Sequence, residues 1–232
     1  MSAPAGRAAS AAPPAGDHDE PLSQMPKTRE TYETPALRLV AHSLLYTEEF
    51  TPTDEPSPAA LVARVWAELS QLSTEFTIWL EDMPAPEDLS DEERAQRDEV
   101  DEGRLSTRFA VVAAFALGAS ARTAPDADPV SPIATKEQRL RDADRDVSHW
   151  IEEHAELWDE LDPEFWLRGT ISLLFGAATG VANLGGVQAP AYEESDCWEA
   201  EEWSALITGS LYQAGTFAAT AAQWFEEYAE AE

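Results

Sequence analysis

Lysine is almost missing from this chain of 232 residues, in which only Lys27 and Lys136 occur beside thirteen arginines. Forty-five acidic residues outweigh these fifteen basic ones and give a formal net charge of −30 at pH 7. Binding to nucleic acids or to anionic membranes depends on clusters of Lys and Arg that reach phosphate groups. The charge balance therefore excludes ordinary nucleic-acid binding and argues against docking on a membrane.

Cysteine occurs once, at Cys197. A single thiol cannot form an internal disulfide, so the fold needs no oxidising compartment. The first thirty residues also lack the charged start and the apolar stretch of a secretory signal. We therefore expect a cytoplasmic protein.

The shortage of lysine and the surplus of acid admit two explanations. A GC-rich genome favours arginine and alanine codons, which accounts for the missing lysine but not for the acidic surplus. Adaptation to high salt accounts for both, because in molar salt the Debye length falls to about 3 Å and repulsion between carboxylates is screened. Both readings stay open, and a merely acidic protein is the simpler one.

Long apolar runs are missing as well. The longest charge-free run near the middle of the chain, Gly169–Val187, spans 19 residues but contains five glycines together with Thr, Ser and Asn. It meets the length criterion for a membrane span only nominally. We predict a buried core helix there and no membrane span.

No segment alternates polar and apolar residues with period two between turn residues, so we predict an all-α protein with no substantial sheet. Residues 1–33 begin with small residues and prolines, which predicts a disordered arm. Residues 34–232 are predicted to form one helical bundle. A second proline-rich stretch, 123–132, is either a subdivision of that bundle or a long surface loop.

Helix starts are marked by a short polar residue directly before a proline. This pair begins at Thr34, Ser57, Ser131 and Asp162. The polar side chain accepts a hydrogen bond from an N–H group of the first turn, and proline at the first helical position loses no hydrogen bond. With a capping pair at Ser90 and Glu93, these signals predict six helices. Their expected ranges are 35–48, 58–83, 91–120, 132–161, 163–184 and 196–229.

Apolar residues within the predicted helices recur at alternating spacings of three and four, as at Val62, Val65 and Leu69. This spacing puts one narrow apolar seam on each helix and favours near-parallel packing at about +20°. The fifth predicted helix and the middle of the sixth are nearly free of charge and rich in small residues. We therefore predict that these two helices lie against each other at the centre of the bundle, with the fifth buried on all sides.

Catalytic motifs are also missing. The chain has no phosphate loop, no Cys-x-x-Cys, no dinucleotide fingerprint and no Gly-x-Ser-x-Gly elbow. We predict no cofactor. Histidine and carboxylate side chains on facing helices are nevertheless how bundles build metal sites. The metal candidates are His42 in the first predicted helix and His149, Glu153 and His154 in the fourth.

These candidates do not share one face of the predicted helix. His154 lies on the apolar seam between Trp150 and Leu157, whereas His149 and Glu153 lie off that seam on an acidic face. The alternative to a metal site is therefore one buried, hydrogen-bonded histidine and one solvated histidine.

Tryptophan is frequent, with eight in the chain. Six of them lie on or beside the apolar seams and are expected in the core. Trp158 and Trp198 lie at helix edges, where an aromatic side chain can anchor a partner.

Three functions remain open. The first is a non-catalytic protein with a structural or protein-interaction role, acting through a protein partner or self-association. The second is a metal-dependent bundle enzyme that uses the histidines. The third is an acidic inhibitor or nucleic-acid mimic that binds a basic partner. The segment 81–102, with eleven acidic residues against two arginines, suits the third, although acidic residues also spread over the rest of the chain.

Overall fold

The computed structural model describes residues 57–81, 89–90, 100–123, 132–187 and 198–231. Its elements are α2 (Pro58–Glu81), α4 (Glu102–Thr123), α5 (Pro132–Glu153), the 3-10 helix η4 (Ala155–Glu160), α6 (Pro163–Leu184) and α7 (Ala200–Ala231). Every regular element in the described part of the chain is thus a helix, which confirms the all-α prediction. The predicted arm, 1–33, the predicted helix 35–48 and the interior of the proline-rich stretch lie outside the described residues.

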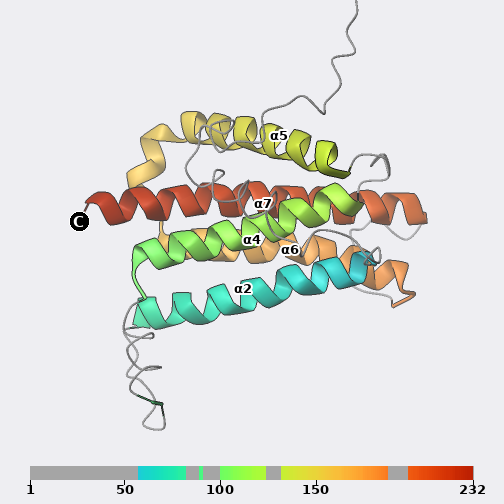
Figure 1. Ribbon diagram of the computed structural model, residues 1–232, viewed down its shortest axis with the longest axis horizontal. Helices are drawn as coiled ribbons and strands as arrows, with labels where there is room; N and C mark the ends of the chain where they lie inside the picture. Colours follow the sequence, from blue (N-terminus) through green and yellow to red (C-terminus); the bar gives the residue numbers. More distant parts are fainter. Residues whose placement is uncertain (1–56, 82–88, 91–99, 124–131, 188–197, 232) are drawn as a thin grey trace, which may run out of the picture.

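The helices lie side by side, and α7 runs the full length of the bundle (Figure 1). In this view α5 lies on one side of α7 and α2 on the other, with α4 and α6 between them (Figure 1). The contacts of α7 with α4 and with α6 are the most extensive between any two elements, and α7 also touches α5. The C-terminal helix is therefore the centre around which the other helices pack.

The helix that accompanies α7 in the core is α4 rather than α6. Nearly every residue of α4 from Phe109 to Ala121 is buried. Most of these residues are alanines or other small side chains, which let the α4 backbone come close to α7. Sequence periodicity missed this role because an alanine-rich run shows no seam of large apolar residues.

The prediction that α6 is buried on all sides is wrong. Phe175, in the middle of this helix, is 57% exposed, and Phe165 is exposed as well. The predicted contact between α6 and α7 is present, but α6 is buried on one side only. Within the described residues α6 is the one helix long and apolar enough to cross a membrane by length and composition, and 39% of its most apolar window is buried.

Three helix starts agree with the polar–proline signal, since α2, α5 and α6 begin at the predicted prolines Pro58, Pro132 and Pro163. The Ser57 hydroxyl accepts a hydrogen bond from the Ala60 N–H at 3.2 Å, and α2 begins at the next residue. The Asp162 carboxylate accepts one from the Glu164 N–H at 2.9 Å, and α6 begins at Pro163. These caps confirm the predicted starts of α2 and α6.

Two other predicted helices differ from the observed ones at their N-terminal ends. The predicted helix 91–120 is not continuous, because Val100 and Asp101 are not helical. α4 begins at Glu102, with the Asp101 carboxylate accepting a 2.7 Å hydrogen bond from the Arg104 N–H. Trp198 and Glu199 are likewise outside α7, which begins at Ala200. Asp101 is thus the side-chain cap of α4, whereas at α7 the Glu202 carboxylate of the first turn accepts a hydrogen bond from the Glu199 N–H.

The fourth predicted helix, 132–161, is interrupted. α5 ends at Glu153, His154 forms a turn with φ −112° and ψ 15°, and η4 continues the chain as a 3-10 helix. The seam consequently fails in its last turns, where Leu157 is 49% exposed. The physical reason is a contact between distant segments, because the turn directs Trp158 onto α7, where both its backbone carbonyl and its indole are hydrogen-bonded.

Close approach through small residues is confirmed at the centre of the bundle. A Cβ placed on Gly180 of α6 would lie 2.6 Å from Cγ1 of Ile207 and 3.1 Å from the Trp203 carbonyl oxygen on α7. A Cβ on Gly215 of α7 would lie 2.7 Å from Cγ of Leu117 on α4. Glycine at these positions therefore lets both neighbouring helices come within packing distance of α7.

Candidate functional site

The predicted metal residues do not come together as a set. Nε2 of His149 lies 3.3 Å from Oε1 of Glu153, one turn along the exposed face of α5. No group of three His, Cys, Asp or Glu side chains within the described residues could hold a metal ion. His42 lies outside those residues, so a site that includes it stays a prediction.

His154 is held in the turn after α5 by an aromatic neighbour. Its ring stacks on Trp150 with centroids 4.1 Å apart and planes at 11°. Its Nδ1 lies 2.9 Å from the Trp150 carbonyl oxygen. Because a carbonyl can only accept, Nδ1 carries the proton of this hydrogen bond, which is the satisfied arrangement expected of a structural histidine.

An aromatic cluster fills the end of the bundle where α5, η4 and α6 meet α7. Trp166 of α6 is fully buried at its centre, with the rings of Trp150, Phe217, Trp158 and Trp224 at 5.3, 5.1, 6.1 and 6.3 Å. Tilted and edge-on geometries dominate, as is usual for packed aromatic rings. The cluster fixes this end of the molecule as a rigid unit.

The cluster continues along α7 toward α2. Trp224 packs against Phe225 at 4.9 Å, and Phe225 stacks on Phe109 of α4 at 5.3 Å. Phe225 also meets Phe76 and Trp79 of α2 edge-on, at 6.2 and 5.9 Å. One continuous set of rings thus links all layers of the bundle at this end.

Hydrogen bonds hold η4 against α7. The Trp224 indole N–H donates to the Trp158 carbonyl oxygen at 2.9 Å, and the Trp158 indole N–H donates to Oε2 of Glu227 at 2.7 Å. The Gln223 amide donates to the other oxygen of Glu227 at 2.9 Å. The Trp158 side chain and the Glu227 carboxylate are therefore fixed in place by neutral donors.

A groove of about 360 Å³ opens between η4 and the last turns of α7. It is lined by Trp158, Asp159, Trp224, Glu227 and Tyr228. Trp224 is 4% exposed, whereas Tyr228 is 39% exposed and stacks on the Trp224 ring at 5.0 Å. The groove thus combines a buried indole, two more accessible rings and two carboxylates.

Neither carboxylate of the groove forms an ion pair with another described residue. The nearest arginine in sequence, Arg168, is instead engaged with Asp162 and Glu164 at 3.3 and 2.9 Å. The groove therefore holds two negative charges beside aromatic rings, and no cation from the described part of the chain pairs with them. Such a site favours a positively charged ligand.

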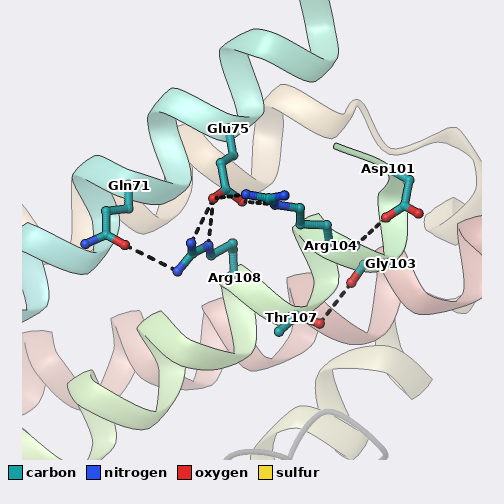
Figure 2. A network of polar contacts seen from close by, with 7 residues as sticks. All are labelled: Gln71, Glu75, Asp101, Gly103, Arg104, Thr107 and Arg108. Carbon is teal, nitrogen blue, oxygen red and sulfur yellow. Dashed lines mark hydrogen bonds and ion pairs between the residues drawn. The ribbon is translucent and has the colours of Figure 1, made fainter. Parts of the chain in front are cut away.

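A second polar centre joins α2 to α4 (Figure 2). The Glu75 carboxylate accepts hydrogen bonds from Arg104 at 3.0 Å and is paired with Arg108 at 2.8 Å, and Arg108 also donates to Gln71 at 3.3 Å. Burial raises the pKa of Glu75, but the hydrogen bonds and charges of the two arginines outweigh burial, so its pKa lies below the usual value. All groups in this network have partners, which marks it as structural.

Sequence reasoning missed the groove, although it named three of the residues that line it. Trp158 was placed at a helix edge as a possible anchor, and Trp224 and Tyr228 continue the apolar seam of the last predicted helix. Asp159 and Glu227 were not singled out. The groove forms only because α5 breaks at His154, and no proline or glycine marks that break. A continuous helix would carry the apolar seam from Trp150 to Leu157 and Leu161. Trp158 follows Trp150 by eight residues and lies off that seam, and this was the one signal of a break in the sequence.

Comparison of the chain with family models, with curated proteins and with solved structures finds no match. The fold and the groove therefore define the molecule only as an acidic, all-α helical bundle with an aromatic groove at one end.

Proposed function

We propose that the chain is a non-catalytic interaction protein that binds a basic protein partner at the aromatic end of its bundle. The observation that carries the proposal is the groove between η4 and α7, where two carboxylates without a cationic partner among the described residues lie beside Trp and Tyr rings. Aromatic anchors and complementary charge are the features by which protein interfaces gain affinity and specificity.

The charge of the whole chain supports a basic partner over self-association. A net charge of −30 attracts a basic protein from a distance and raises its rate of encounter. A second copy carries the same charge and is repelled at low salt. A protein partner of opposite charge is therefore the favoured ligand of this surface.

Rigidity of the groove also suits binding. Trp158 is bonded at its carbonyl and at its indole, and Trp224 is locked between Tyr228 and Phe225. Side chains that are already ordered lose little conformational entropy when a partner docks.

The test is the affinity of the full chain for a fluorescent lysine-rich peptide, measured by anisotropy at fixed ionic strength. The double variant Asp159→Asn/Glu227→Gln removes the groove charges. The control Glu199→Gln/Glu201→Gln removes two exposed charges, one just before α7 and one in its first turn; Glu201 lies about 39 Å from Glu227 along the helix.

We expect the groove variant to bind the peptide roughly tenfold more weakly and the control variant to bind within about twofold of the original chain. If both variants bind the peptide equally weakly, the affinity depends only on net charge, and the groove is not the binding site. Lack of binding by the original chain at low salt would remove the basic partner altogether.

A further inference from the structure

We propose that the aromatic groove is a binding site for an alkylammonium head group, held over the rings of Trp158 and Tyr228 and between the carboxylates of Asp159 and Glu227. This inference rests on the proposed interaction function and names the chemistry that the groove recognises. The head group can belong to a free quaternary ammonium compound or to a lysine of the partner, methylated or not.

Aromatic rings supply the first part of the recognition. A cation within about 6 Å of an aromatic face is attracted by the negative potential of the ring, most strongly by an indole. The groove offers Trp158 and Tyr228 as partly exposed rings and Trp224 as a buried indole stacked on Tyr228. An alkylated ammonium suits such walls, because its methyl or methylene groups also gain from removal from water.

Uncompensated charge supplies the second part. Both oxygens of Glu227 accept hydrogen bonds from neutral donors, the Trp158 indole and the Gln223 amide, which position the carboxylate without neutralising it. Asp159 follows Trp158 in η4 and adds a second negative charge to the same groove. A neutral ligand of the same shape gains nothing from these charges, so the groove discriminates in favour of a cation.

The dimensions of the groove fit one head group. Its volume of about 360 Å³ lies near the lower end of the range of small-molecule sites. It is too small for a folded segment of a partner and suits a single side chain or a small ammonium compound. A lysine-bearing partner would thus insert one residue and dock the remainder outside the groove.

The first experiment titrates the full chain with tetramethylammonium chloride, exchanged mole for mole against sodium chloride. The indole N–H signals of Trp158 and Trp224 are followed in ¹H–¹⁵N spectra and assigned with Trp→Phe variants. tert-Butyl alcohol, a neutral probe of nearly the same shape, serves as the control. We expect saturable shifts of these two signals with the ammonium probe only. Equal shifts with the alcohol, or no shifts with either probe, would overturn the proposal.

Variants then divide the recognition into charge and ring. Asp159→Asn/Glu227→Gln should weaken tetramethylammonium binding roughly tenfold, and Tyr228→Ala should weaken it about threefold to fivefold. Tyr228→Phe keeps the ring and should bind like the original chain. Glu199→Gln/Glu201→Gln is the charge-matched control and should leave binding unchanged. Unchanged binding in both the groove charge variant and Tyr228→Ala would place the cation elsewhere.

Three peptides that differ at one position distinguish the sources of the head group. Trimethyllysine or lysine at that position should bind, and norleucine, a neutral side chain of similar length, should not. Tighter binding of a cationic peptide than of tetramethylammonium assigns the head group to a partner protein. Binding of norleucine as strong as that of lysine would contradict recognition of the cation.

The two proposals can fail separately. If tetramethylammonium shifts the groove signals but no lysine-rich peptide binds, the ammonium site stands and the protein-partner function falls. If the peptide binds but the indole signals of Trp158 and Trp224 do not shift with tetramethylammonium, the partner function is supported and the ammonium site is contradicted.

Discussion

Glu75 shows how a single charged residue is accommodated inside an acidic protein. Its side chain is 10% exposed, and it is paired with the side chains of Arg104 and Arg108, which are 34% and 29% exposed. Burying a carboxylate without partners costs several kcal/mol, so the two arginines are necessary for this position to be tolerated. In a chain with few basic residues, using two of them on one carboxylate indicates that α2 and α4 are held together here.

Replacing Glu75 with Gln should destabilise the protein by about 1–3 kcal/mol at pH 7. The loss is smaller than for a fully buried pair because both arginines still reach water. Urea unfolding of the full chain measures the effect. Glu164→Gln, which breaks the exposed pair with Arg168, is the control and should cost less than about 1 kcal/mol.

Low pH should remove the difference in the free energy of unfolding between Glu75→Gln and the original chain. The pKa of Glu75 is lowered in the folded state, so its stabilisation is complete above the pKa of the unfolded chain and is lost as the pH falls through the lower, folded value. The stabilities of the two proteins should therefore begin to converge as the pH falls below about 4, and they should become equal below the folded pKa. A difference that stays constant from pH 7 to pH 3 would show that shape rather than charge is responsible.

His154 marks the residue at which sequence reasoning reached its limit. Its position on the seam predicted burial in a continuous helix, and in the structure it is half-buried in a turn, stacked on Trp150. The periodic pattern records which residues are apolar, but it does not record the contacts between distant segments. The bonds of Trp158 with Glu227 and Trp224, 69 and 66 residues away, accompany the break in the helix and are invisible to local patterns.

At the scale of whole elements, the polar–proline signal located the starts of α2, α5 and α6 to the residue. This succeeded because capping is local chemistry between neighbouring residues. The burial of α6 and the central position of α4 could not be predicted in the same way. The burial of a helix depends on how many other helices pack against it. Small residues permit close packing, but they do not determine which helix packs there.

Substitution of glycines tests the close contacts of α7. Gly180→Ala should destabilise the bundle by about 1–3 kcal/mol, because the new methyl group would meet Ile207 and the Trp203 backbone oxygen. Gly209→Ala in α7 is the control, since nothing outside the nearby helix backbone lies within 4 Å of the Cβ position of Gly209. It should stabilise by about 0.5–1 kcal/mol through helix propensity. Thermal unfolding measures both, and equal effects of the two changes would contradict close packing of α6 on α7 at Gly180.

At the scale of the whole molecule, the net charge of −30 should make stability depend on salt. If the acidic surplus is an adaptation to high salt, the melting temperature should rise steadily from dilute buffer to molar potassium chloride as repulsion is screened. The measurement is a series of thermal melts at fixed pH. A melting temperature that does not change with potassium chloride concentration would contradict adaptation to high salt and would favour a merely acidic protein from a GC-rich genome.

The net charge of the molecule and the aromatic rings of the groove both support the proposal that this bundle binds a basic partner through an ammonium group. The most direct test is competition between tetramethylammonium and a bound fluorescent lysine-rich peptide on the full chain, at constant ionic strength. We expect tetramethylammonium to release the peptide at concentrations at which sodium has no effect, and Asp159→Asn/Glu227→Gln to lose this selectivity. Equal displacement by sodium and by tetramethylammonium would contradict binding of the partner through an ammonium group.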